Sequence, residues 1–163
     1  MHARDSIRGT MDLSLMVVDK YLGDLSDAEL LLRPGPGCHT IAWQLGHLIY
    51  SGGEMLNSLS AGAAPQLPSG FAEQHSKERA SSDDPAGFCS KAEYLAHFAN
   101  LREAVSTALD KISDADLDAP APESMRAWFP TVGAVYTLIA THPLMHAGQF
   151  VPVRRALGKP VVI

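Results

Sequence analysis

The sequence predicts an all-α protein, a four-helix bundle with an up-down-down-up or related topology and a long loop between its second and third helices. Three observations support this prediction. Four segments repeat apolar residues every three or four positions, and most of these segments follow a residue suited to capping a helix. No segment shows the convincing alternation of apolar and polar residues that is typical of a strand.

The composition fits a single domain that covers residues 1–163. The chain is 46% hydrophobic and 19% charged, which allows one compact core but not two full domains. Its formal net charge of −5 disfavours binding to nucleic acid or to an anionic membrane. No apolar run approaches the ~20 residues of a membrane helix, and the N-terminus lacks a signal-peptide pattern, so we expect a cytoplasmic protein. Cys38 and Cys89 are expected to be free thiols, and the alternative is a single disulfide between them.

The first helix is predicted over residues 7–25, where apolar side chains form one stripe. Ser26 and Glu29 then match a capping box, in which each side chain satisfies a free backbone N–H of the other residue. A short helical turn should therefore follow Ser26. The proline and glycine residues at 33–37 end that turn.

The second helix is predicted over residues 41–59, after Thr40 as its N-cap, and it carries His47. Residues 60–89 are rich in Gly, Pro, Ser and Asp, with one brief helix-compatible piece near residues 71–79. Structureless loops of this length are uncommon in small domains, so we expect either a lid or a partly helical segment. This loop is also where we expect substrate selectivity to be determined.

The third helix has the cleanest amphipathic pattern of the chain, over residues 94–112, and it follows a capping box formed by Ser90 and Glu93. The fourth helix is predicted over residues 132–157 and is capped by Thr131. Two prolines inside this last helix should bend it: Pro143 and Pro152.

A short connector occurs twice in the chain. Residues 25–30, LSDAEL, are echoed by residues 112–117, ISDADL. Each copy follows an amphipathic helix and precedes a threonine-capped helix that bears histidine. The sequence therefore divides into two helical hairpins, although a similarity this short is weak evidence for a true repeat.

His142 and His146 are candidate metal ligands. Four residues apart, they lie on one helix face, one turn from each other, and that face is otherwise apolar. Buried imidazoles need a partner, and a divalent metal provides one, with His47 as a third ligand from the second helix. The alternative is that all three are core histidines bonded to the backbone or to one another, and a bare pair of this kind would favour that alternative.

The other four histidines have simpler interpretations. We expect His2 to be terminal and disordered, and His75 to lie in the polar loop. His39 precedes a helix and is interpreted as a turn residue. His97 lies beside the core stripe of the third helix, where a partly exposed, hydrogen-bonded side chain is ordinary.

Two motifs carry a resemblance to a known family. They are TIAWQLGHL at residues 40–48, and THPLMHAGQF at residues 141–150 followed by Arg154. Together, in this order, they resemble the motifs of the DinB superfamily (DinB/YfiT-like) of metal-binding four-helix bundles, over nearly the whole chain. The resemblance implies that His47, His142 and His146 are the three metal ligands.

Three neutral histidines around one ion leave a position for water or substrate, which is typical of a catalytic site. The resemblance implies a thiol S-transferase, which would use a low-molecular-weight thiol such as bacillithiol or mycothiol, or a metal-dependent hydrolase or isomerase. We expect a small-molecule substrate and a divalent metal, zinc or nickel first, with iron or manganese as alternatives. A different class of function is also open: a non-catalytic bundle that a metal stabilises, or that senses a ligand.

Three further residues are candidate helpers in the site. Glu54 lies two turns beyond His47, although a solvated surface glutamate is the simpler interpretation. Gln149 is a candidate for orienting a ligand or a water. Arg154 could hold an anionic group, although a charge that complements the helix dipole is the more common role. Bundles of this size often pair through an exposed apolar helix face, so a homodimer is also expected as a possibility.

Overall fold

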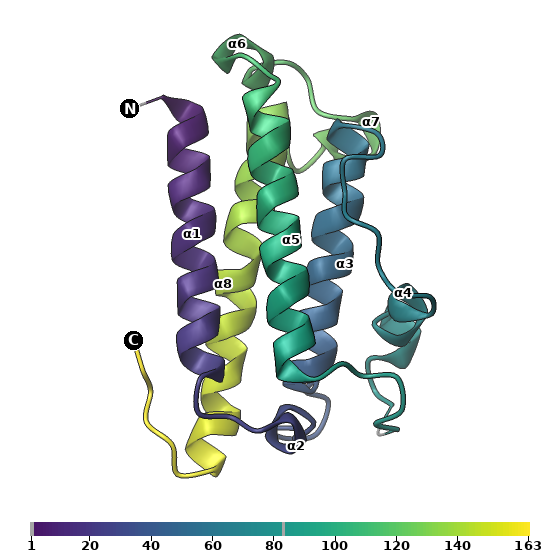
Figure 1. Ribbon diagram of the computed structural model, residues 1–163, viewed down its shortest axis with the longest axis vertical. Coiled ribbons are helices and arrows are strands. Elements are labelled where there is room, and N and C mark those ends of the chain that lie inside the picture. Colours follow the sequence, from purple (N-terminus) through teal and green to yellow (C-terminus); the bar gives the residue numbers. More distant parts are fainter. Residues whose placement is uncertain (1, 83) are drawn as a thin grey trace.

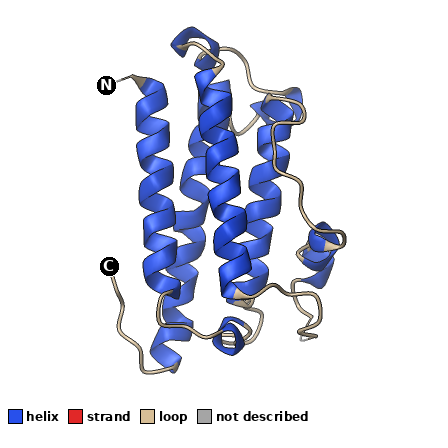
Figure 2. Cartoon of the chain, in the orientation of Figure 1, coloured by secondary structure: helices blue, strands red, loops and turns tan. Residues whose placement is uncertain are grey.

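The computed structural model describes residues 2–82 and 84–163, and four long helices dominate it (Figures 1 and 2). Three of them start after the predicted capping residues: the side chains of Thr40, Ser90 and Thr131 each accept a hydrogen bond from a backbone N–H of the first helical turn. The first helix starts and ends three to four residues earlier than the predicted range of 7–25. The four long helices are α1 (Ala3–Leu22), α3 (Ile41–Leu59), α5 (Lys91–Asp110) and α8 (Val132–Ala156). The predicted all-α four-helix bundle is confirmed.

The helices follow the predicted topology. In the view of Figure 1, α1 and α8 run downward and α3 and α5 run upward. Helix α1 packs on α8 and α5, and α3 packs on α5 and α8. The two helices that carry the candidate ligands, α3 and α8, are therefore antiparallel neighbours.

Short helices close both ends of the bundle (Figure 1). The two copies of the repeated connector form α2 (Asp27–Leu30) and α6 (Asp114–Leu117), and Ser26 and Ser113 cap them through capping boxes. Helix α7 (Glu123–Arg126) was not expected from the sequence. Among the described residues, strand-like pairing is limited to an isolated bridge between Pro120 and Thr131.

The long loop between α3 and α5 is partly helical, as one of the two sequence interpretations expected. It contains α4 (Phe71–Gln74) and a 3₁₀ helix, η1 (Lys77–Arg79). Helix α4 packs against α3 (Figure 1). The loop therefore covers the outer side of the helix that carries His47.

The core consists of two apolar clusters stacked along the bundle. One cluster includes Phe98 and Phe150, and the other includes Leu56 and Ile139. Helix α8 runs without interruption through Pro143 and Pro152, so neither proline divides it. Within the described residues, 2–82 and 84–163, no helix is both long and apolar enough to cross a membrane.

Candidate metal centre

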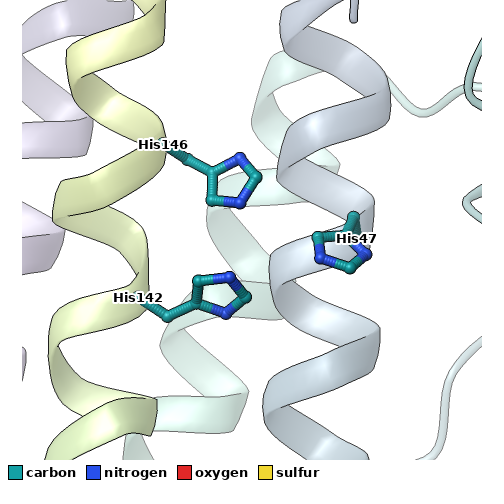
Figure 3. Close-up of side chains that lie close together, drawn as sticks. All are labelled: His47, His142 and His146. Carbon is teal, nitrogen blue, oxygen red and sulfur yellow. The ribbon is translucent and has the colours of Figure 1, made fainter.

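The structure brings His47, His142 and His146 together (Figure 3). One nitrogen of each ring lies within 4.8 Å of the corresponding nitrogen of the other two. The ring centroids are 4.9 Å apart for the pair on α8, and each lies 5.6 Å from the ring of His47. The i, i+4 spacing on α8 and the packing of α3 against it therefore bring all three candidate ligands to one point.

Trp43 holds the ring of His47 in place. It lies one turn earlier on α3, and the two rings stack with centroids 5.0 Å apart and an interplanar angle of 7°. The indole Nε1 of Trp43 donates a hydrogen bond of 2.9 Å to the backbone oxygen of Ser76 in the long loop. The same tryptophan therefore supports a candidate ligand and fastens the loop to α3.

Gln44 is a site residue whose role the sequence did not reveal. Its side chain is 1% exposed, and its Oε1 lies 2.9 Å from Nδ1 of His146. The sequence placed Gln44 beside His47 on the same helix. Its contact with α8 depends on how two helices pack, which no local pattern in the sequence records.

Burial keeps the three imidazoles neutral at neutral pH. It lowers the pKa of His47 to about 4 and the pKa of His146 to about 4, and the positive charge that His142 would carry if protonated adds to both effects. Burial also lowers the pKa of His142. A neutral imidazole has a free lone pair, so these rings are ready to bind a metal ion without first losing a proton.

The residues present fit a divalent metal. Imidazole nitrogen is a ligand that zinc and nickel accept, and the three rings each bring one nitrogen to a common point. Nitrogens bound to one tetrahedral zinc ion at about 2.0–2.1 Å lie about 3.4 Å apart. Because the three nitrogens already lie within 4.8 Å, shifts of under about 1 Å complete the site.

A cavity of about 490 Å³ lies beside His47. One wall is α3, which contributes Tyr50, Ser51 and Glu54, and the opposite wall is the long loop at residues 75–78. The volume is in the range of small-molecule sites. A small molecule in this cavity would lie next to the histidine cluster.

A family comparison decides the classification. A model of the DinB superfamily matches residues 10–150, which is most of the chain. The chain belongs to the DinB superfamily. The resemblance drawn from the two histidine motifs is therefore confirmed. No curated protein sequence matches the chain.

Solved structures share the fold of this DinB-superfamily chain. A conserved protein from Enterococcus faecalis superposes with a TM-score of 0.73 at 18% identity, covering 98% of this chain and 99% of that one. YfiT from Bacillus subtilis superposes with a TM-score of 0.65 at 16% identity, covering 96% of this chain and 89% of that one. YfiT is described as a probable metal-dependent hydrolase with an unusual four-helix bundle topology. At these identities, the likeness shows the fold.

The three candidate helper residues of this DinB-superfamily chain differ in their exposure and in their surroundings. Glu54 is exposed and lines the cavity beside His47. Gln149 is exposed on α8. Arg154 is 1% exposed, and its guanidinium donates hydrogen bonds to Asp24 and to the backbone oxygens of Tyr21 and Pro160. The structure therefore gives Arg154 a structural partner in place of an anionic substrate.

One histidine outside the cluster, His75, corrects the sequence interpretation. His75 is fully buried: Nδ1 donates to the backbone oxygen of Phe71, and Nε2 lies 2.7 Å from the hydroxyl of Tyr94. His2 is exposed, and its ring lies 3.2 Å from the carboxylate of Asp114. Polar composition near His75 suggested an exposed loop, whereas its contacts with α4 and α5 bury it.

The remaining residues of the DinB-superfamily chain that the sequence singled out have ordinary surroundings. His39 lies just before α3 with its ring against Trp43, and Nδ1 is 3.2 Å from the backbone oxygen of Ala80. His97 is partly buried on α5. Cys38 and Cys89 are free.

Proposed function

We propose that this chain is a divalent-metal-dependent enzyme that acts on a small molecule, with hydrolysis as its first expected reaction. The observation that carries the proposal is the convergence of His47, His142 and His146 beside an open cavity. Three protein ligands in place of four are typical of catalytic zinc sites. A closed structural site would need a fourth protein ligand at the cluster.

When bound, a divalent metal supplies Lewis-acid chemistry, which polarises a carbonyl and makes water or a thiol nucleophilic near neutral pH. The three histidines would hold it through neutral nitrogens. Glu54 lines the cavity on the helix of His47, and in the proposed reaction its carboxylate would accept a proton from a reacting group. The loop at residues 75–78 forms the opposite wall of the cavity. The description of YfiT as a probable metal-dependent hydrolase supports hydrolysis.

Thiol S-transfer is the second reaction of the same proposal. Imidazole ligands suit zinc and nickel, and both metals bind thiolates. A low-molecular-weight thiol would then lose its proton and serve as the nucleophile. Its sulfur would bond to a carbon of an electrophile in the cavity as the bond to a leaving group such as a halide breaks. The two reactions differ in their need for an added thiol, so one assay series separates them.

The test compares metal-free protein with protein reloaded with zinc or nickel. Both forms are assayed against chromogenic carboxylic esters, amides and phosphoesters, and against an aryl halide with added thiols. We expect turnover only in the reloaded protein, and we expect His47→Ala to reduce it to the metal-free level. Glu54→Gln should keep its metal and lower kcat by about a hundredfold, because it removes a proton acceptor. Glu103→Gln, an exposed change on α5, is the matched control.

A negative result has a defined meaning. If the reloaded protein binds its metal and none of the substrates is turned over above the metal-free level, the enzymatic proposal is contradicted. The chain would then fit the other class expected from the sequence, a bundle that a metal stabilises or that senses a ligand. Equal turnover in Glu54→Gln and in the unaltered chain would remove Glu54 from the mechanism and leave the metal proposal intact.

A further inference from the structure

Gln44 makes two hydrogen-bonding contacts that together fix the orientation of its amide. Its Nε2 donates to the backbone oxygen of His39 at 3.2 Å, and its Oε1 faces Nδ1 of His146 at 2.9 Å. In the reverse orientation, the amide oxygen would face the carbonyl oxygen of His39, and two acceptors would repel each other. The backbone at His39 therefore determines that an acceptor is turned toward His146.

An acceptor at this position selects one tautomer of His146. A neutral imidazole carries a single N–H, and an amide oxygen accepts a hydrogen bond but cannot donate one. Nδ1 of His146 must therefore carry the hydrogen, which leaves Nε2 with its lone pair. Figure 3 shows that the rings of His146 and His142 turn nitrogens toward each other. The lone pair of His146 is thus directed into the histidine cluster.

We propose that Gln44 is a positioning residue that holds His146 as its Nδ1–H tautomer and so commits Nε2 to the metal. This inference rests on the metal site of the proposed function and adds a specific role for one residue within it. Hydrogen bonds of this kind fix the orientation of a ligating ring and raise its basicity. Gln44 is 1% exposed, so water does not compete for either of its contacts.

His142 provides an internal contrast. Its Nδ1 is buried and has no hydrogen-bond partner among residues 2–82 and 84–163. The other ligand on the same helix therefore lacks the support that Gln44 gives to His146. Gln44 and His39 lie at the start of α3, so this end of α3 sets the chemistry of a ring on α8.

The backbone oxygen of His39, which accepts from Gln44, is held in position by its surroundings. His39 precedes Thr40, the N-cap of α3, whose side chain accepts a hydrogen bond from the N–H of Trp43. The ring of His39 packs against Trp43 with centroids 4.4 Å apart. The helix start is thus held at several points, and the orientation of the Gln44 amide depends on a well-supported carbonyl.

The first test is zinc affinity, measured by competition with a chromophoric chelator on the full chain. Gln44→Met keeps the size of the side chain but removes the acceptor, and we expect it to weaken zinc binding by about 10–100-fold. Gln44→Glu keeps an acceptor oxygen toward Nδ1 of His146 but loses the donor to the backbone oxygen of His39, so it should restore only part of the affinity. Gln74→Met is the control, because Gln74 is also buried but contacts Arg79 in the loop. It should change zinc affinity by less than about twofold.

The second test reads the tautomer directly and does not depend on the metal. In metal-free protein labelled with ¹⁵N in histidine, the ring couplings of His146 should show the hydrogen on Nδ1, and Gln44→Met should weaken that preference. A hydrogen on Nε2 of His146 in the unaltered chain would overturn the proposal. Zinc affinity unchanged in Gln44→Met would also overturn it, whereas a failure of the unaltered chain to bind zinc would contradict the proposed function instead. If Gln44→Met does not fold, the unaltered chain and Gln44→Glu still decide the question.

Discussion

Gly46 lies where α3 comes closest to the loop that covers it. A Cβ atom built on this glycine would overlap the ring of His75, which is fully buried between α3, α4 and α5. Because both ring nitrogens of His75 are engaged, the ring has little freedom to move away. The absence of a side chain at residue 46 therefore allows the loop to pack on the helix.

Gly46→Ala should destabilise the protein. Overpacking of a buried contact costs about 1–3 kcal/mol, which exceeds the roughly 1 kcal/mol that alanine usually gains over glycine inside a helix. Gly148→Ala is the matched control, because no atom outside its own helix lies within 4 Å of the added Cβ. Urea unfolding of both variants measures the difference, and a Gly46→Ala variant as stable as Gly148→Ala would contradict this packing.

The same contact explains why His75 was misjudged from the sequence. The residues around it are polar and rich in Gly, Pro and Ser, which is the composition of an exposed loop. Its burial depends on Gly46 and Tyr94, which lie in separate helices and are distant in the sequence. A glycine inside a helical pattern is a sign of close approach, but it does not identify the approaching residue.

Arg154 connects the end of α8 to the end of α1. Its guanidinium donates to the carboxylate of Asp24 and, at 2.7 Å, to the backbone oxygen of Tyr21. It also donates at 2.8 Å to the backbone oxygen of Pro160, in the segment that follows α8. The guanidinium beside Asp24 lowers the pKa of that carboxyl group. One side chain therefore fixes three segments at this end of the bundle.

Arg154→Met should destabilise the protein by about 2–4 kcal/mol, somewhat below the usual loss for a buried ion pair because Asp24 is half exposed. Arg155→Met, which alters the exposed neighbour, should change stability by less than about 0.5 kcal/mol. Thermal unfolding measures both variants. Since Arg154 is assigned a structural role, its variant should retain the metal content of the unaltered chain. Loss of metal with unchanged stability would instead indicate that Arg154 acts in the metal site, as the sequence had suggested.

The elements themselves could be predicted because their signals are local. Ser26, Thr40 and Ser90 each accept the backbone hydrogen bond that the capping pattern anticipated, and the apolar spacing located each long helix to within about four residues. Helix α7, a single turn, has no such spacing. The contacts of Gln44 and Arg154 also went unpredicted, because each joins helices through the tertiary packing.

At the scale of the whole molecule, burial of the histidine cluster makes stability depend on pH. The pKa of His47 and of His146 is lowered to about 4 in the folded chain, against an ordinary value of 6.5. Between these values, the unfolded chain binds more protons than the folded one. The burial of these neutral rings therefore costs no stability above about pH 6.5, and the free energy of unfolding decreases as the pH drops from 6.5 toward 4.

The slope of this loss is at most about 1.4 kcal/mol per pH unit for each of the two imidazoles. Denaturant unfolding of metal-free protein at several pH values measures it. His146→Gln removes one titrating group and should flatten the curve relative to the unaltered chain. Identical pH profiles for the two proteins would contradict the burial of a neutral imidazole at this position.

The measurement that tests the central claim most directly is the metal content of untagged protein after exposure to zinc or nickel and removal of loosely bound ions. The three-histidine site predicts about one ion per chain, lost in His47→Ala, His142→Ala and His146→Ala. His97→Ala, a change on α5 outside the cluster, should keep the full metal content. An unaltered chain that takes up no divalent ion, or histidine variants that all retain it, would contradict the assignment of the metal centre.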